Sequence, residues 1–174
     1  MKEESLNTIR KYIEFRATES PHSAFVTCPH TNHKISNIQL KNNLDKINFY
    51  LVNKKKQKKK SKICTLIENS LSSTQLMLGI MYSGMIQVPL NLVAGEEQLA
   101  YVISHSESKI IFASSSNFKL AKRMVNRLSS DIEIVEINKD NFVDEIDNNF
   151  EIIKENTNCN DNALLMYTSG TTGK

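Results

Sequence analysis

Between residues 36 and 137 the sequence alternates between two hydrophobic patterns, and this alternation limits the fold more than any other feature. Apolar residues recur at helical spacing over residues 36–51, 72–84, 95–108 and 117–128. Short apolar runs follow these segments at residues 62–67, 85–90, 109–113 and 131–137. Helices that alternate with short buried strands are typical of a mainly parallel sheet with helices on both faces. We therefore predict an α/β fold.

Two serines mark the expected starts of helices. Ser36, with Gln39 three residues later, forms a candidate capping box, in which each side chain bonds the backbone N–H of the other residue. Ser72 with Gln75 offers the same pattern for the second helix. Gly84 lies where that second helix could end in the left-handed conformation. Local signals therefore support the boundaries that the periodicity predicts.

Three further segments flank this alternating region. Residues 24–27 and 33–36 are extended in character and enclose "CPHTN" at residues 28–32, which predicts a hairpin. The stretch after residue 138 is acidic and weakly periodic, with one short helix expected at residues 140–147. The apolar run at residues 163–167 is expected to form a last strand that delivers the chain into a glycine-containing loop.

Length and charge fit one globular domain or a part of one. The chain has 174 residues, of which 40% are hydrophobic and 24% charged. Seven of the 22 basic residues lie at residues 54–62, so the rest of the chain is acidic on balance. A block of lysines can attract nucleic acid or anionic lipid. We expect a lysine-rich surface loop at residues 53–62 and no specific nucleic-acid partner, because aromatic and arginine residues are absent from it.

Cysteine spacing and hydropathy indicate a cytoplasmic protein. Cys28, Cys64 and Cys159 lie far apart and cannot all pair, which favours a reducing compartment. The first twenty residues mix acidic and basic side chains and lack the apolar core of a secretory signal. Residues 69–95 carry no charge, but the glycine, proline and polar residues within them oppose a membrane span.

No metal site is predicted. His22, Cys28, His30 and His33 gather around the expected hairpin and are the residue types that bind zinc. Their spacing is irregular and only one of them is a cysteine, so the ordinary polarity of a hairpin explains them as well.

The last eight residues, "YTSGTTGK" at 167–174, carry the strongest chemical signal. Gly170 and Gly173 allow backbone angles and close approaches that side chains forbid. A loop of small residues after a parallel strand can turn several backbone N–H groups towards an anion. A Walker A loop is excluded, because Thr168 stands where that motif needs its first glycine and no residue follows Lys174. Phosphate is the predicted ligand.

This segment closely resembles the signature loop of the adenylate-forming superfamily, which contains acyl-CoA synthetases, luciferases and adenylation domains. Seven defined positions agree in order with the family's Tyr-Thr-Ser-Gly-Thr-Thr-Gly, and Lys174 falls in the variable position that follows. Residues 33–40, 62–70 and 78–114 are also similar to segments of that family, in the same order and at consistent spacing. The resemblance thus covers most of the chain.

The resemblance implies an ATP-dependent, AMP-forming ligase. In that family the loop holds the β- and γ-phosphates of ATP, used with Mg²⁺, while a carboxylate attacks the α-phosphorus. A thiol, of CoA or of a carrier protein, then captures the acyl group of the adenylate. Donors held where negative charge develops are the general reason that such loops help. By position, the cofactor-binding residues would be Thr168, Ser169, Gly170, Thr171, Thr172, Gly173 and Lys174.

The expected acyl substrate is a fatty acid, within fatty acid metabolism. This expectation rests on the likeness of "VPLN" at residues 88–91 and its neighbours to acyl-CoA synthetases. The acyl pocket itself lies later in the family's sequence.

The resemblance also implies that much of the catalytic machinery is missing. The end of the loop, the adenine and ribose segments, the magnesium-associated glutamate and the lid with the catalytic lysine all follow later in the family. We therefore expect residues 1–174 to be part of an N-terminal AMP-binding domain, truncated in the loop at 167–174, without catalytic residues and inactive alone. The alternatives are a non-catalytic remnant and an anion-binding module that uses the lysine run, and a downstream fragment is a candidate partner.

Overall fold

Four parallel strands form the central sheet, and they are the apolar runs that the sequence predicts as buried strands. The computed structural model describes residues 6–29, 32–128, 131–154 and 157–168. The strands are β3 (Lys62–Leu66), β4 (Ile86–Pro89), β5 (Ile110–Ser114) and β6 (Glu133–Ile137). They lie in the order β4-β3-β5-β6, and all three pairings are parallel. The predicted fold class is confirmed.

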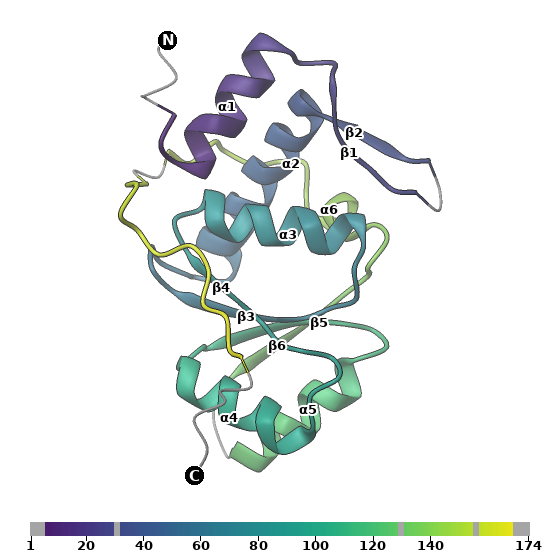
Figure 1. The fold of residues 1–174 in the computed structure, drawn as a ribbon, viewed down its shortest axis with the longest axis vertical. Helices are drawn as coiled ribbons and strands as arrows, with labels where there is room; N and C mark the ends of the chain where they lie inside the picture. Colours follow the sequence, from purple (N-terminus) through teal and green to yellow (C-terminus); the bar gives the residue numbers. More distant parts are fainter. Residues whose placement is uncertain (1–5, 30–31, 129–130, 155–156, 169–174) are drawn as a thin grey trace.

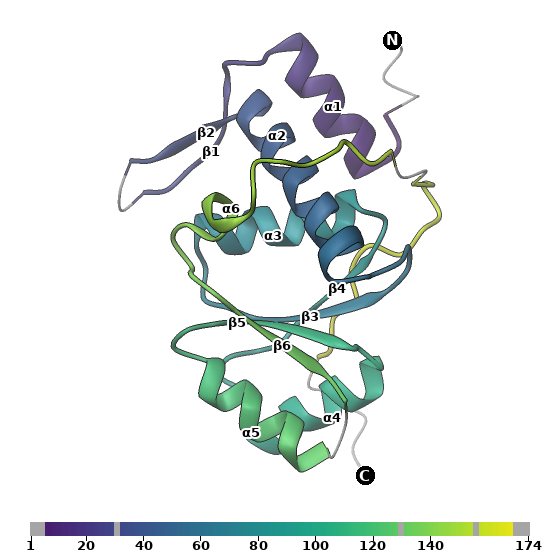
Figure 2. The same cartoon turned by 180° about the vertical axis from the view of Figure 1, so that it is seen from behind.

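Helices cover both faces of this sheet, as Figures 1 and 2 show from opposite sides. One face carries α1 (Ile9–Glu19), α2 (Asn37–Phe49), α3 (Leu71–Tyr82) and α6 (Phe142–Glu145), and the other carries α4 (Glu96–Ser106) and α5 (Phe118–Leu128). Successive side chains of a strand point to opposite faces. Ile63 therefore joins the hydrophobic cluster under α2 and α3, whereas Cys64 joins the one above α4 and α5.

The predicted hairpin is also present, beside the layer of α1 and α2. It consists of β1 (Ala24–Thr27) and β2 (Lys34–Ser36), which pair antiparallel. The backbone N–H of Cys28 donates to the carbonyl of His33 over 2.8 Å and closes the turn. The hairpin thus positions Cys28 and His33, two of the four residues considered above as zinc ligands, and His22 lies in the turn before β1. His30 lies outside the described residues.

Helix α2 begins as its sequence predicts. The Ser36 N–H donates to Gln39 Oε1 over 2.9 Å and the Gln39 N–H donates back to Ser36 Oγ over 3.4 Å, which completes the capping box. Its inward side chains are fully buried; they are Leu40, Leu44 and Ile47, together with Leu51 in the turn that follows. That turn, Tyr50–Lys54, is π-helical, which the hydrophobic pattern does not reveal.

Helix α3 begins two residues earlier than the sequence predicts. Ser70 caps it and exchanges bonds with Ser73, so the predicted capping box of Ser72 and Gln75 is wrong. Three closely spaced serines offer alternative caps, and Ser70 is the residue with extended backbone angles after β3. Ser72 is buried instead, and its hydroxyl accepts from the Phe142 N–H over 3.2 Å.

Helix α1 is absent from the sequence predictions and packs onto the core through Ile13 and Ala17, with Arg10 as its buried polar contact. Arg10 is 6% exposed, its Nε donates to the carbonyl of Tyr82 over 3.0 Å, and its guanidinium lies 4.0 Å from the centre of the Tyr82 ring. The Tyr82 hydroxyl donates to Asp45 over 2.9 Å. Burial, together with the Asp45 carboxylate, raises the pKa of Tyr82 far above its ordinary value, which keeps the hydroxyl protonated as a donor.

The lysine-rich segment is tied to acidic residues on three other elements. Lys54 still belongs to the π-helical turn and Lys62 already belongs to β3, so the loop proper comprises residues 55–61. Three close ion pairs have N–O distances of 2.5, 2.8 and 3.0 Å: Lys55 with Glu133, Lys59 with Asp161 and Lys62 with Glu107. A fourth, Lys60 with Asp161, is longer at 4.0 Å.

The uncharged window at residues 69–95 folds as α3, a turn and β4. Gly84 in that turn has φ +67°, which is the left-handed conformation expected at the end of α3. Among the residues that the structure describes, no helix is long and apolar enough to cross a membrane.

Gly79 sets the closest approach of α2 and α3. A Cβ at this position would lie 2.5 Å from Ile47 Cγ2, so we expect Gly79→Ala to destabilise the fold by about 1–3 kcal/mol, although alanine favours helices elsewhere. Urea unfolding measures this. In an Ile47→Leu background, which lacks the offending methyl, the penalty of Gly79→Ala should be smaller, and an unchanged penalty would contradict the contact.

Candidate functional site

The order of the strands singles out one end of the sheet. The chain passes from β3 to β4 on one side and then to β5 on the other side of β3, so the winding reverses between β3 and β5. Ligands of open parallel sheets bind beyond the carboxyl ends of the strands at such a reversal. In this chain, Glu68 after β3 accepts hydrogen bonds from Ser116 and Asn117 after β5. These bonds join the two loops across the reversal.

The Glu68 carboxylate is held in its charged form. Burial raises its pKa, but hydrogen bonds from the Ser114 and Ser116 hydroxyls and the charge of Lys139 together bring the pKa below the ordinary value of a glutamate. Glu68 Oε2 is buried and has no hydrogen-bond partner among the described residues. No pattern in the sequence predicts this cluster, because its members come from separate loops.

A second place of interest is the outer edge of β4, which the chain crosses near its end. Residues 157–168 run past this edge from the α1 side of the sheet to the α4 side (Figures 1 and 2). At the crossing, the Gln87 N–H donates to Ala163 over 3.0 Å and the Leu165 N–H donates to Gln87 over 2.9 Å. The strand predicted at residues 163–167 is thus a single parallel bridge at Leu164, because the segment crosses the sheet edge rather than following it.

A cleft of about 370 Å³ opens beside this crossing. Its walls come from α3, the ends of β3 and β4, and the crossing segment, including Thr65, Met77, Gln87, Pro89, Leu164 and Met166. Leu164 is 43% exposed and Met166 is 65% exposed. The side chain of Gln87 donates to Thr65 Oγ1 over 3.2 Å, and its Oε1 has no partner within the described ranges. The cleft thus combines apolar side chains with polar ones, which also include Asn69, Ser73 and Thr74.

The crossing segment ends against α4. The Tyr167 hydroxyl lies 2.8 Å from His105 Nδ1, and the Tyr167 ring packs against the rings of His105 and Tyr101. Burial raises the pKa of Tyr167, whereas the nearby Lys62 lowers it to a smaller extent. The periodicity of α4 leaves Tyr101 and His105 on the outward side of the helix, one turn apart, and no sequence signal connects them with a tyrosine more than sixty residues later.

The predicted phosphate-binding residues begin immediately after this contact. Thr168 is exposed and follows Tyr167 directly. The other predicted residues lie outside the described part of the chain: Ser169, Gly170, Thr171, Thr172, Gly173 and Lys174. Their position beyond the carboxyl ends of the strands remains a prediction, and what the structure establishes is the anchorage of the residue before them.

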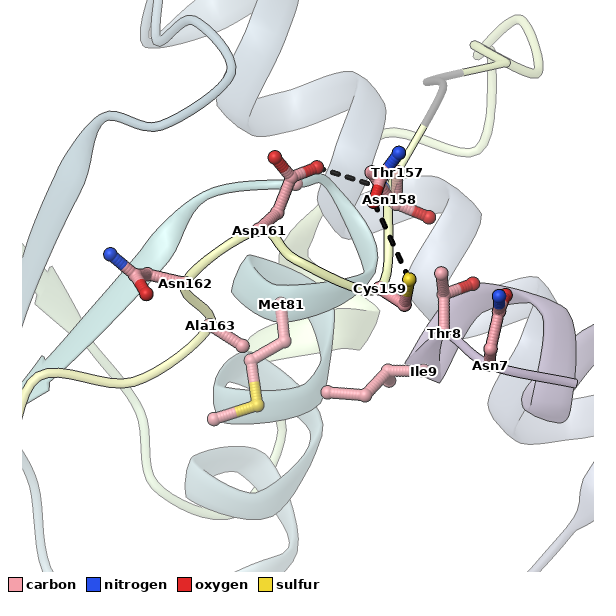
Figure 3. Close-up of a pocket in the computed structure, with 11 residues that line it drawn as sticks. Asn7, Thr8, Ile9, Met81, Thr157, Asn158, Cys159, Asp161, Asn162 and Ala163 are labelled. Atoms are coloured by element: carbon pink, nitrogen blue, oxygen red, sulfur yellow. Dashed lines mark hydrogen bonds between the residues drawn. The ribbon is translucent and has the colours of Figure 1, made fainter.

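A second cavity, shown in Figure 3, lies between the crossing segment and the start of α1. It has a volume of about 160 Å³ and is lined by the start of α1, Met81 of α3 and the turn around Cys159. The Asn158 N–H donates to Asp161 over 2.8 Å, and the Cys159 thiol donates to Asn158 over 3.5 Å. These bonds shape the turn, and Asp161 is already paired with Lys59. Among the described residues, no group of three or more His, Cys, Asp or Glu side chains could hold a metal ion.

Comparison with known proteins identifies the family. Residues 13–174 match the model of the AMP-binding enzyme family, and the chain belongs to this family. The sulfoacetate–CoA ligase of Cupriavidus necator is 25% identical over 114 residues, which are 64% of this chain and 22% of that protein. The probable CoA ligase CCL8 of Humulus lupulus is 31% identical over 108 residues, which are 56% of this chain and 18% of that protein.

A solved structure supports the same fold. The fatty acyl CoA synthetase of Mycobacterium tuberculosis superposes with a TM-score of 0.79 at 19% identity, over 95% of this chain and 33% of the synthetase. The present chain therefore spans about a third of the length of that synthetase, and less of the two relatives.

The Glu68 cluster can be tested by its pH dependence. A lowered pKa means that the folded state favours the charged carboxylate, so the stabilisation is complete above the ordinary pKa of about 4.3 and is lost as the pH falls through the lowered value. We expect Glu68→Gln to cost about 1 kcal/mol at neutral pH and less in acid. Urea unfolding at neutral pH and in acid measures this cost. The control is Glu151→Gln, which makes the same change at an exposed residue. An equal cost at both pH values would contradict the cluster.

Proposed function

We propose that this chain is the phosphate-binding part of an ATP-dependent, AMP-forming carboxylate–thiol ligase. The observation that carries the proposal is family membership combined with the glycine-threonine loop, which starts one residue after the side chain anchored on α4. The backbone N–H groups and hydroxyls of residues 168–173 are suited to the β- and γ-phosphates of ATP, and Lys174 adds positive charge.

Mg²⁺ is proposed to reach the site with the triphosphate. When bound, the ion supplies positive charge at the phosphate oxygens, where it commonly uses substrate phosphates and only one or two carboxylates. Within the described ranges no cluster of acidic or histidine side chains is available for it. By the family resemblance, a carboxylate for the ion would come from a later segment of the ligase.

The proposed substrates are a carboxylic acid and a thiol acceptor. CoA is favoured as the acceptor by the two CoA ligases among the relatives. A fatty acid is favoured by the likeness of residues 88–91 to acyl-CoA synthetases, and a cytoplasmic location by the spacing of the cysteines. A carrier protein remains the alternative acceptor.

The chain alone is not proposed to complete the reaction. Leu164 and Met166 expose apolar surface over the cleft at the β4 edge, where a further part of a ligase would cover them. This part would be supplied by a longer polypeptide or by a complementing fragment. The activity of a whole ligase would thus depend on residues outside this chain.

Binding of ATP provides the direct test. We expect saturable, magnesium-dependent binding of a fluorescent ATP analogue to the purified chain, weakened about tenfold or more by Gly170→Val, because a side chain would obstruct close approach of phosphate. Gly95→Val is the matched control, since a Cβ there meets nothing within 4 Å. Absence of binding by the unaltered chain, or equal binding by Gly170→Val, would contradict the retained phosphate site.

A second candidate function, anion binding by the lysine loop, is favoured by one observation. Exposure alternates along the loop: the inward members of the run form ion pairs, whereas four others project into solvent, namely Lys54, Lys56, Lys58 and Lys60. Lys60 is 69% exposed and only 4.0 Å from Asp161, at the limit of an ion pair. A row of outward charges is a surface to which a polyanion could bind.

Retention on heparin tests this second function. Neutralising the four outward lysines to glutamine should lower the salt concentration at which the chain elutes, because fewer counterions are released on binding. The control neutralises four exposed lysines elsewhere: Lys34, Lys109, Lys119 and Lys154. Equal shifts in both variants would show that net charge, not this loop, determines retention.

A further inference from the structure

A group of three rings lies where the chain leaves the sheet for the phosphate loop. Tyr101 and His105, one turn apart on α4, have ring centres 5.4 Å apart. The ring of Tyr167 stands edge-on to both, at 6.4 Å from Tyr101 and 5.6 Å from His105, with interplanar angles of 90° and 87°. Edge-to-face contacts at these distances are the favoured arrangement of aromatic pairs.

One polar contact also joins two members of this group. The Tyr167 hydroxyl and His105 Nδ1 are 2.8 Å apart. A neutral imidazole can accept the hydroxyl proton at Nδ1, and a protonated one can donate to the hydroxyl oxygen, so the contact is available in either state. Tyr101 is 59% exposed, so the contact of the three rings lies at the surface of α4.

Few other contacts hold the end of the crossing segment in place. The backbone of residues 163–167 makes two hydrogen bonds to the sheet, both at Gln87, and Leu164 and Met166 point into the open cleft. Leu165 and Tyr167 pack towards the α4 side. Among the described residues, Tyr167 is therefore the last side chain with a fixed partner before Thr168.

We infer that Tyr101 and His105 act as positioning residues: they clamp Tyr167 and so determine the direction in which the phosphate loop starts. This inference rests on the proposed function of that loop, and it gives Tyr101 and His105 a role that the family resemblance stated above does not assign to them. Neither residue is assigned contact with nucleotide. Their effect on binding passes through Tyr167 and reduces the freedom that the loop must lose when phosphate binds.

The experiment uses the whole 174-residue chain and two readouts. The first is the backbone ¹H–¹⁵N signal of Thr168, and the second is the affinity for MgATP. Tyr167→Phe removes the hydroxyl and keeps the ring, and His105→Ala removes the partner. We expect both variants to shift the Thr168 signal and to weaken MgATP binding by about three- to tenfold, with unchanged thermal melting because both changes remove only groups near the surface.

Two further variants separate positioning from general damage. His105→Asn places an amide near the position of Nδ1 and should restore much of the Thr168 signal. Tyr12→Phe removes the hydroxyl of another exposed tyrosine and should change nothing. A Thr168 signal that is unaffected by Tyr167→Phe and His105→Ala would overturn the inference.

The outcomes distinguish this inference from the proposed function. If the unaltered chain binds no MgATP but the Thr168 signal depends on His105, the clamp stands and the retained phosphate site fails. If the chain binds MgATP and the clamp variants bind it equally well, the phosphate site stands and the clamp is refuted.

Discussion

The structure depends on the burial of β3 between two neighbouring strands and two layers of helices. Its backbone groups pair with β4 on one side and β5 on the other, and its side chains alternate between the two hydrophobic clusters. A parallel strand in this position needs apolar residues on both faces, because neither face meets water. This requirement explains why the buried residues of β3 are apolar except for Thr65, and why helices are needed on each side. The loops that follow β3, β4 and β5 are positioned as a result.

Much of the fold could be predicted because the hydrophobic period changes sharply between elements. The strands β3 to β6, helices α2, α4 and α5, and even the short α6 agree with the sequence. Cap positions are harder, since a stretch with three serines contains several equivalent signals and the backbone angle of Ser70 decides among them. Helix α1 was missed because only Arg10, Ile13 and Ala17 are buried, one of them charged, so its apolar stripe is narrow.

The candidate site, too, could be predicted from the sequence only in part. The loop sequence could be identified because its residue types and order are specific, whereas its anchorage could not. Tyr167, His105 and Tyr101 meet only after α4 is folded onto the sheet and the chain has crossed the β4 edge. Glu68 likewise gains Ser116 and Asn117 as partners through the strand order, not through spacing in the sequence. Long-range contacts of this kind produce no periodic pattern in the sequence, so the sequence alone does not predict them.

The crossing at β4 has a consequence for how the molecule behaves in crowded solution. An outer strand with unsatisfied backbone groups invites another chain to add to the sheet, which leads to polymers. Here the crossing segment forms hydrogen bonds with both backbone groups of Gln87 and lies across the strand. A strand of another molecule would have to displace this segment before it could pair with β4. The segment that brings the chain to its phosphate loop thus also covers the β4 edge of the sheet at Gln87.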